Sequence, residues 1–371
     1  MKRPDAGLLF NMSDGLFGVI PRGSGSDFGL HPVGSGPYRF VSQMQDKDVV
    51  LERFHACWSQ DLPVDGHPAH TSIERLEFNV VPDTITSALE LQKGSADAAS
   101  NVLTPDMVYA MRGQPRVDIS DGPGSNVWYL NFNTQDSALR DKRVRQAIAL
   151  AIDRPAIVAA IWRGHARLAT TLLPPGHWAS ADPADVATYP YDPTRAQAIL
   201  SSAGYPAGPD GVRLHLEVKI STDETTRLLA VVLQQQFRAA GITLTIRSAE
   251  FGTFYSDVTH GAFQMYILKW IGSNEDPDIF RYMYSSASFP PHGANRGRYA
   301  NPRIDALLEK VAGESGPDAQ ARRCVDAIEI QKILADDMPS VPLWFPGNEV
   351  VHTSRLRDVV SQSDGNFDFL R

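Results

Sequence analysis

The sequence predicts an α/β protein with two lobes. Its 371 residues are too many for one ordinary hydrophobic core, and at about 150 residues per domain the length favours two. Two stretches of the chain each combine alternating, strand-like segments with amphipathic helices. Hydrophobic residues make up 43% and charged residues 21%, a balance typical of globular proteins and unlike disordered or collagenous chains.

The first α/β stretch occupies the first third of the chain. A Gly- and Ser-rich start leads into two strand-like segments at residues 38–54 and 73–81. A helix capped by Asp83 follows, and Thr104 and Pro105 open a second one. These elements predict one α/β lobe.

The second α/β stretch begins with a strand at residues 126–133 and continues through three well-capped amphipathic helices. Residues 212–220 alternate apolar and polar side chains without a fault, which predicts a strand at an edge or only partly covered on one face. A helix over 229–237 and a strand over 242–246 follow, which indicates a βαβ unit. A further strand at 263–268 completes the second lobe.

Charge, hydropathy and cysteine content exclude several classes. Lys and Arg number 35 against 43 Asp and Glu, and the net charge of −8 disfavours nucleic acid as a partner. The N-terminal apolar run breaks at Asn11 and Asp14, too early for a signal peptide, and no run of about 18 apolar residues predicts a membrane span. Cys57 and Cys324 alone cannot build a disulfide framework or a Cys-rich zinc site, although one long-range disulfide stays open.

No common catalytic template is present. The sequence lacks a Walker loop, a G-x-S-x-G elbow, an H-E-x-x-H motif and a Rossmann fingerprint. Two clusters keep a hydrolase or metal-dependent enzyme on an α/β scaffold as the alternative function. They are the group His55, Cys57, His67 and His70, and the carboxylates Glu275, Asp276 and Asp278. Solvated loops and capping groups explain both clusters more simply, because neither provides a nucleophile, a base and an orienting group together.

The segment 269–278 is the strongest candidate for a binding loop. It directly follows a strand predicted to be buried, and in α/β sheets ligands gather at the carboxyl ends of strands. Trp270 offers an aromatic surface, and Gly272 allows a ligand to approach the backbone. The alternative is equally weighted: Trp270 belongs to the core, and Asp276 only caps the next helix.

Motifs along nearly the whole chain resemble the bacterial extracellular solute-binding proteins of family 5, which serve ABC importers for peptides, opines and nickel. No single motif is decisive, but their number and order are specific. They are GSGPY at 34–38, WYLNFN at 128–133, RVRQAI at 143–148 with AIDR at 151–154, YDP at 191–193 with AGYP at 203–206, GI at 241–242, GAF at 261–263 leading to Trp270, YANPRID at 299–305 and PSVPL at 339–343.

This resemblance implies a two-lobed, periplasmic-binding-protein-like fold of class II, peptide-binding type. Residues 1–21 would be the remnant of an accessory domain, 22–126 with 337–371 a discontinuous first lobe, and 127–336 the second lobe. Family members carry a signal peptide and a considerable region ahead of the position of Met1, so the accessory domain is expected to be largely missing here.

The resemblance also carries ligand positions over to this sequence. Peptide-binding members hold the ligand's ammonium group with an Asp three residues after the Trp, and here that position is Ser273. Glu275 or Asp276 could replace this Asp only after a shift of the loop, so binding of a peptide ammonium is disfavoured. A second contact position, acidic in some members, is Asn131. Both are neutral, which favours a less cationic solute such as a modified peptide, a sugar or another polar metabolite. The complete expected ligand-binding set is Trp270, Ile271, Gly272, Ser273, Asn274, Tyr129, Asn131 and Asn133.

The function implied by the resemblance is that of the substrate-binding component of an ABC-type importer. Its partners would be a peptide or other small polar solute and an ABC permease in the membrane. The protein is expected to be monomeric, without cofactor or catalytic residues, and periplasmic or otherwise extracytoplasmic.

Overall fold

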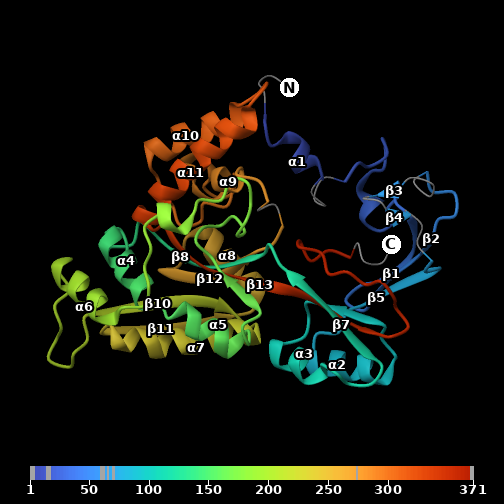
Figure 1. Ribbon diagram of the computed structural model, residues 1–371, viewed down its shortest axis with the longest axis horizontal. Helices are drawn as coiled ribbons and strands as arrows, with labels where there is room; N and C mark the ends of the chain where they lie inside the picture. Colours follow the sequence, from blue (N-terminus) through green and yellow to red (C-terminus); the bar gives the residue numbers. More distant parts are fainter. Residues whose placement is uncertain are drawn as a thin grey trace. The chain divides into compact units, whose positions relative to one another are not determined.

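A computed structural model divides the chain into two compact units (Figure 1). The large unit comprises residues 1–12 and 123–347, and the small unit residues 13–122 and 348–371. The structure describes residues 5–13, 18–58, 63–64, 67–68, 72–272 and 275–367.

The large unit is built on a mixed β-sheet with strand order β11, β10, β12, β8 and β13, and β9 also pairs with β13. β10 is parallel to β11 and to β12, whereas β8 is antiparallel to both β12 and β13. The strand bounds are β8 Val127–Phe132, β9 Ala166–Leu168, β10 Leu214–Ser221, β11 Ile242–Ala249, β12 Met265–Trp270 and β13 Ser340–Thr353.

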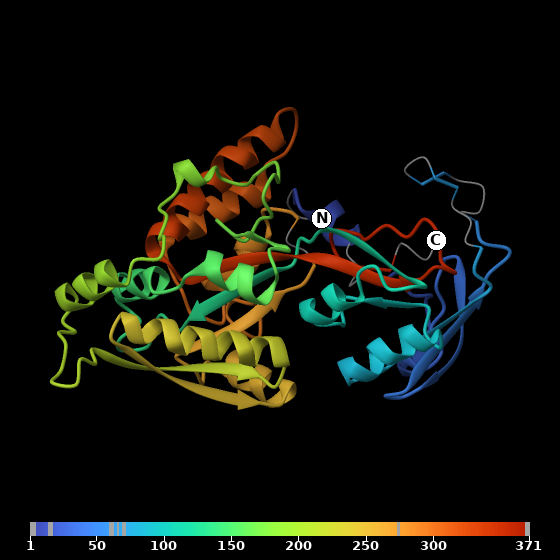
Figure 2. The same ribbon diagram turned by 60° about the horizontal axis from the view of Figure 1, so that its bottom comes forward.

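Helices cover both faces of this sheet (Figures 1 and 2). Side chains of α4 to α7 share one apolar core with the sheet, and side chains of α8 to α11 share another. The helix bounds are α1 Leu8–Ser13, α4 Lys142–Leu150, α5 Arg154–Ile161, α6 Pro193–Ser202, α7 Glu224–Ala239, α8 Phe251–His260, α9 Ile279–Tyr284, α10 Pro302–Gly313 and α11 Ala319–Asp337.

Strand β8 shows the two-sided burial most clearly, because all six of its residues are buried. Its side chains alternate between the faces: Trp128, Leu130 and Phe132 enter the core under α4 to α7, and Val127 and Tyr129 enter the core under α8 to α11. The predicted strand at 126–133 is therefore confirmed, as a fully covered inner strand.

Local capping chemistry sets the starts of the helices where the sequence predicts them. The Asp153 carboxylate accepts a hydrogen bond from the Ala156 amide at 3.0 Å, and Asp192 accepts one from the Arg195 amide at 2.8 Å. Both caps satisfy amide groups that have no partner within their helix.

The predicted position of β10 is only half right. Its alternation is confirmed, since Leu214, Leu216, Val218 and Ile220 are buried and the residues between them are more exposed. The edge position is wrong, because β10 lies between β11 and β12 and β11 forms the edge. The polar face reflects incomplete helical covering of an inner strand, which was the other alternative.

The small unit combines an antiparallel sheet with two helices. The sheet has the order β1, β2, β5, and a small core is formed by Leu91, Val108, Met111, Val117 and Val351. The bounds are β1 Tyr38–Met44, β2 Asp48–Arg53, β3 Pro63–Val64, β4 His67–Pro68, β5 Arg75–Asn79, α2 Thr84–Lys93, β6 Ala98–Ser100, α3 Pro105–Met111 and β7 Val117–Pro123.

Strand β13 belongs to both units. Ser340 pairs with Asn131 of β8 in the large unit, and Val350 pairs with Ser100 of β6 in the small unit. The boundaries between the two units fall at 122/123 and 347/348, whereas the sequence predicts lobe boundaries at 126/127 and 336/337. The difference arises because the first half of β13 pairs with the strand that begins the large unit.

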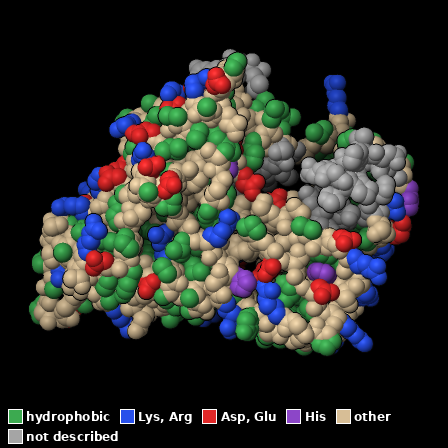
Figure 3. Space-filling model, viewed as in Figure 1, with side chains coloured by type: hydrophobic (Ala, Val, Ile, Leu, Met, Phe, Trp, Pro, Cys, Tyr) green, Lys and Arg blue, Asp and Glu red, His purple; other side chains and the backbone are tan. Residues whose placement is uncertain are grey.

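The surface carries charges of both signs. On the face of the molecule that Figure 3 shows, Lys and Arg side chains are interspersed with Asp and Glu. Among the described residues, no helix has the length and apolar character needed to cross a bilayer.

Arg145 links two backbone segments from within α4. Its side chain is buried, and its guanidinium donates hydrogen bonds to the carbonyl oxygens of Leu139 at 2.6 Å and Met338 at 2.8 Å, and to that of Asp337. Burial lowers the pKa of this guanidinium. Arg145 thereby holds the junction of α11 and β13 against α4.

We expect Arg145→Met to lower the free energy of unfolding by about 3 kcal/mol, because buried carbonyl groups lose their donors. Arg143→Met, on the same helix, is the matched control: Arg143 is an exposed partner of Asp141 and should cost less than about 1 kcal/mol. Urea denaturation followed by circular dichroism measures both, and equal losses would contradict this role of Arg145.

Candidate functional site

The predicted binding loop begins where β12 ends. Trp270 is the last residue of β12 and pairs with Val127, the first residue of β8. The Gly272 amide donates a hydrogen bond to the Asn126 side-chain oxygen at 3.2 Å. Gly272 has φ of +69°, a conformation that side chains with a Cβ rarely adopt. These contacts fix the first residues of the loop against the segment that precedes β8.

Trp270 carries an unsatisfied donor at this position. Its ring packs edge-on against Tyr282, with the ring centroids 5.8 Å apart. The indole Nε1 atom is buried, and no residue in the described part of the chain accepts its hydrogen. Leaving a buried N–H without an acceptor costs about 1–3 kcal/mol. A ligand group that accepts this indole hydrogen would therefore stabilise the protein.

Ile271 differs from Trp270 in that most of its side chain, 68%, is exposed to solvent. A large aliphatic side chain so exposed at the end of a strand offers apolar contact area to a ligand. Ser273 and Asn274, the next two expected contacts, lie outside the described residues.

The three expected contacts around β8 have structural partners of their own. Tyr129 is completely buried and meets Tyr266 edge-on with centroids 6.0 Å apart. Asn133 donates from its side-chain amide to the Phe263 carbonyl at 3.0 Å. Asn131 is buried against Gly297, where an added Cβ would lie 3.0 Å from the Asn131 amide nitrogen.

The expected contacts do not come together at one point. Tyr266 pairs with Asn131, and Trp270 pairs with Val127, so Trp270 and Asn133 lie at opposite ends of the β8–β12 pair. The six residue steps from Val127 to Asn133 correspond to about 20 Å of extended chain. Trp270 and Asn133 are therefore too far apart for one dipeptide-sized solute to contact both.

Two acidic residues near the end of the loop form ion pairs. The Asp276 carboxylate pairs with Arg323 at 2.6 Å, and both side chains are buried. Asp278 receives two hydrogen bonds from Arg281, each 2.7 Å long. Because both carboxylates already neutralise an Arg, this cluster does not favour the acid–base enzyme alternative.

The second cluster proposed for an enzyme is only partly described. His55 contacts Glu74 at 3.2 Å and the Cys57 sulfur lies 3.9 Å from the Ser35 carbonyl, while the side chains of His67 and His70 lie outside the described residues. Within the described ranges, no three His, Cys, Asp or Glu residues are arranged to hold a metal ion. Cys57 and Cys324 are not joined by a disulfide.

His177 supports the far end of the loop and was not among the predicted site residues. Its Nε2 atom donates to the Glu275 carbonyl at 2.8 Å, and its Nδ1 atom accepts from the Ala179 amide at 3.1 Å. This pair of bonds requires the neutral ring with its proton on Nε2. Burial lowers the pKa of His177. No local pattern links His177 to a loop 98 positions away, so only the folded structure reveals it.

We expect the stability of the protein to fall with acidification partly through His177. A lowered pKa in the folded state means that the unfolded chain binds the proton more readily, so stability present above about pH 6.5 is lost as the pH decreases. In His177→Gln, the difference in unfolding free energy between pH 7.5 and 5.5 should shrink. His215→Gln, at an exposed position of β10, is the control and should keep the wild-type difference.

Comparison with known proteins agrees with the fold and with the order of the motifs. A family model described as bacterial extracellular solute-binding proteins, family 5 Middle, matches residues 1–290. Heme-binding protein A of Haemophilus influenzae is 28% identical over 327 residues, covering 88% of this chain and 56% of that protein. The dipeptide-binding protein of Escherichia coli is 25% identical over 350 residues, covering 92% and 63%. The chain thus spans less than two thirds of the length of both relatives.

Two solved structures have the same fold. NikZ of Campylobacter jejuni in complex with Ni(L-His) has a TM-score of 0.84 at 24% identity, with 99% of this chain and 73% of that one covered. DppA of Helicobacter pylori in complex with the peptide STSA also has a TM-score of 0.84, at 23% identity, with 100% and 70% covered. The two-lobed, class II fold is thereby confirmed. Together with the match over residues 1–290, it shows that this chain belongs to family 5 of the bacterial extracellular solute-binding proteins.

Proposed function

We propose that this chain is the substrate-binding component of an ABC-type importer, which captures a peptide-like or other polar solute and delivers it to the permease. The observation that carries the proposal is the Trp270 loop, in a chain of family 5. There a strand ends, a buried indole N–H has no acceptor among the described residues, and an apolar side chain is exposed next to it.

The proposed cycle uses two lobes that close over the solute and reopen at the permease, with the protein acting as a monomer in an extracytoplasmic compartment. The family's name places its members outside the cell. Curated relatives bind heme, dipeptides or glutathione by name, so family membership supports a transport role and leaves the solute to be argued from this chain's own residues.

The charges around the loop favour a solute without a free ammonium group. The position where peptide binders carry an Asp is Ser273 in this sequence. Of the three carboxylates that follow, Asp276 and Asp278 are paired with Arg323 and Arg281, and the backbone of Glu275 is held by its carbonyl on His177. A buried ammonium needs a compensating carboxylate, and breaking one of these pairs to supply it would leave an Arg uncompensated. We therefore propose N-blocked peptides or neutral polar metabolites as solutes.

We expect N-acetyl-Ala-Phe to raise the melting temperature more than Ala-Phe, because only the free peptide brings an unpaired ammonium. Ser273→Asp should reverse this order by supplying the missing carboxylate. Differential scanning fluorimetry with both peptides measures the shifts. A wild-type protein that prefers Ala-Phe would contradict the proposed solute class and leave the transport role standing.

For any solute found in this way, Trp270→Ala should weaken binding about tenfold or more, since a stacked aromatic and a hydrogen-bond donor are lost together. Phe251→Ala is the control, because Phe251 is an exposed aromatic residue of α8 in the same unit. Isothermal titration calorimetry compares the two. Unchanged affinity in Trp270→Ala would place the solute elsewhere.

A further inference from the structure

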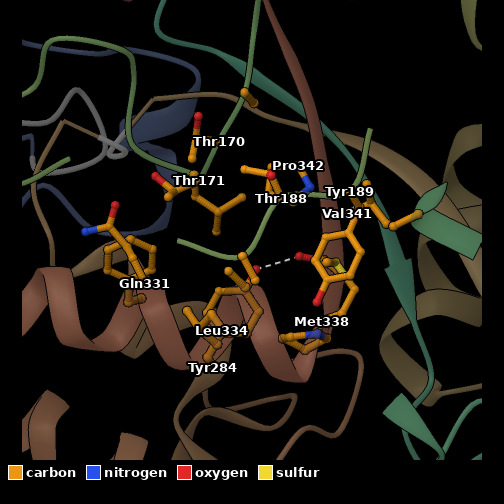
Figure 4. Close-up of a pocket in the computed structure, with 18 of the residues that line it drawn as sticks. Thr170, Thr171, Thr188, Tyr189, Tyr284, Gln331, Leu334, Met338, Val341 and Pro342 are labelled. Atoms are coloured by element: carbon orange, nitrogen blue, oxygen red, sulfur yellow. Dashed lines mark hydrogen bonds between the residues drawn. The ribbon is translucent and has the colours of Figure 1, made fainter. Parts of the chain in front are cut away.

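The large unit contains a second candidate site, a cavity of about 70 Å³ at the junction of α11 and β13 (Figure 4). Its wall is made by the loops after β9 and before α6, by α9 and α11, and by the first residues of β13. In Figure 4, Thr170, Thr171 and Thr188 lie across the cavity from Leu334 and Tyr284. The cavity shares no lining residue with the Trp270 loop.

One cation lines this cavity, and it has an unused binding edge. The Nη1 atom of Arg154 donates to the carbonyl oxygens of Ala169 at 2.7 Å and Pro342 at 3.0 Å. Its Nε and Nη2 atoms donate to no residue in the described part of the chain. These two atoms form the edge that holds carboxylates with two parallel hydrogen bonds, as Arg281 holds Asp278.

Among the described residues, no carboxylate neutralises the charge of Arg154. The residues that line the cavity, all within the described ranges, include no Asp or Glu. Desolvation lowers the pKa of Arg154, and no described carboxylate offsets that effect. Asp336 and Asp337, whose charges reach Tyr189 on the cavity wall, are already paired with Lys142. A partly buried cation without a counter-charge among the described residues favours an anionic occupant.

The rest of the lining is mainly apolar, with Leu172, Phe280, Leu334 and Val341 among the side chains. Apolar walls beside a single cation match a ligand with one carboxylate and a short hydrocarbon chain. A cavity of about 70 Å³ is some five times the space of about 10–15 Å³ that one water needs. That space suits a molecule of about five non-hydrogen atoms.

We propose that this cavity binds a small monocarboxylate of the size of propionate, with its carboxylate on the Nε–Nη2 edge of Arg154 and its alkyl chain against Leu334 and Val341. Amino acids of similar size are excluded, because no acidic side chain lines the cavity to receive their ammonium group. The site goes beyond the proposed transport function, which does not depend on it.

Saturation-transfer NMR with four small ligands tests the proposal on the full chain. We expect propionate to bind with Kd on the order of 1 mM, as a ligand of this size allows. Propionamide has the same shape without the charge and should bind at least tenfold more weakly. L-Alanine adds an ammonium group and should also fail, whereas L-lactate has as many non-hydrogen atoms as alanine and should still bind.

Two variants locate the binding and one serves as control. Arg154→Met should abolish propionate binding, while Arg238→Met, an exposed Arg of α7, should leave it unchanged. Since Arg154→Met also removes two internal hydrogen bonds, Ala335→Leu provides an independent test by filling the cavity from the partly exposed face of α11. No binding of propionate to the wild type, equal binding of propionamide, or undiminished binding in folded Ala335→Leu would each overturn the proposal.

Discussion

The burial of β8 on both faces is the constraint on which the rest of the large unit depends. Its backbone is paired on one side with β12 and on the other with β13, and its side chains fill two separate apolar cores. A strand enclosed in this way has neither backbone nor side chains available for a ligand along its length. The beginning of β8 is where the Trp270 loop lies, because Trp270 pairs with Val127.

This constraint explains why the ligand positions inferred from family members differ in their burial and in their place on the strands. Trp270 is the last residue of β12 and Gly272 follows it, where the strand ends. Tyr129 and Asn131 lie within β8 and are buried, where they pack against Tyr266 and Gly297. A motif can therefore identify the strand correctly and still not decide which of its side chains are accessible.

Local chemistry made much of the fold predictable, and distant pairing made the rest unpredictable. The caps at Asp153 and Asp192 and the alternation of β10 depend on neighbouring residues, so the sequence reveals them. The inner position of β10 depends on β12, which comes 44 residues or more later in the chain. The ion pair between Asp276 and Arg323 and the contact of His177 with Glu275 likewise join distant segments.

The charge that each candidate site offers to a ligand depends on the ion pairs formed there and not on the overall composition. The chain has more acidic than basic residues, yet Asp276 and Asp278 of the Trp270 loop are paired with Arg323 and Arg281. Arg154 is the opposite case. It is a cation in an acidic protein, and no described carboxylate offsets the effect of burial on its pKa. Net charge thus says little about the ligand that an individual site accepts.

Strand β13 has a consequence for how the protein can be divided. Its first residues pair with β8 of the large unit and its last residues pair with β6 of the small unit, within one uninterrupted strand of 14 residues. A cut at the contact boundary between 347 and 348 would pass through the strand itself. Either half expressed alone would therefore keep only part of β13.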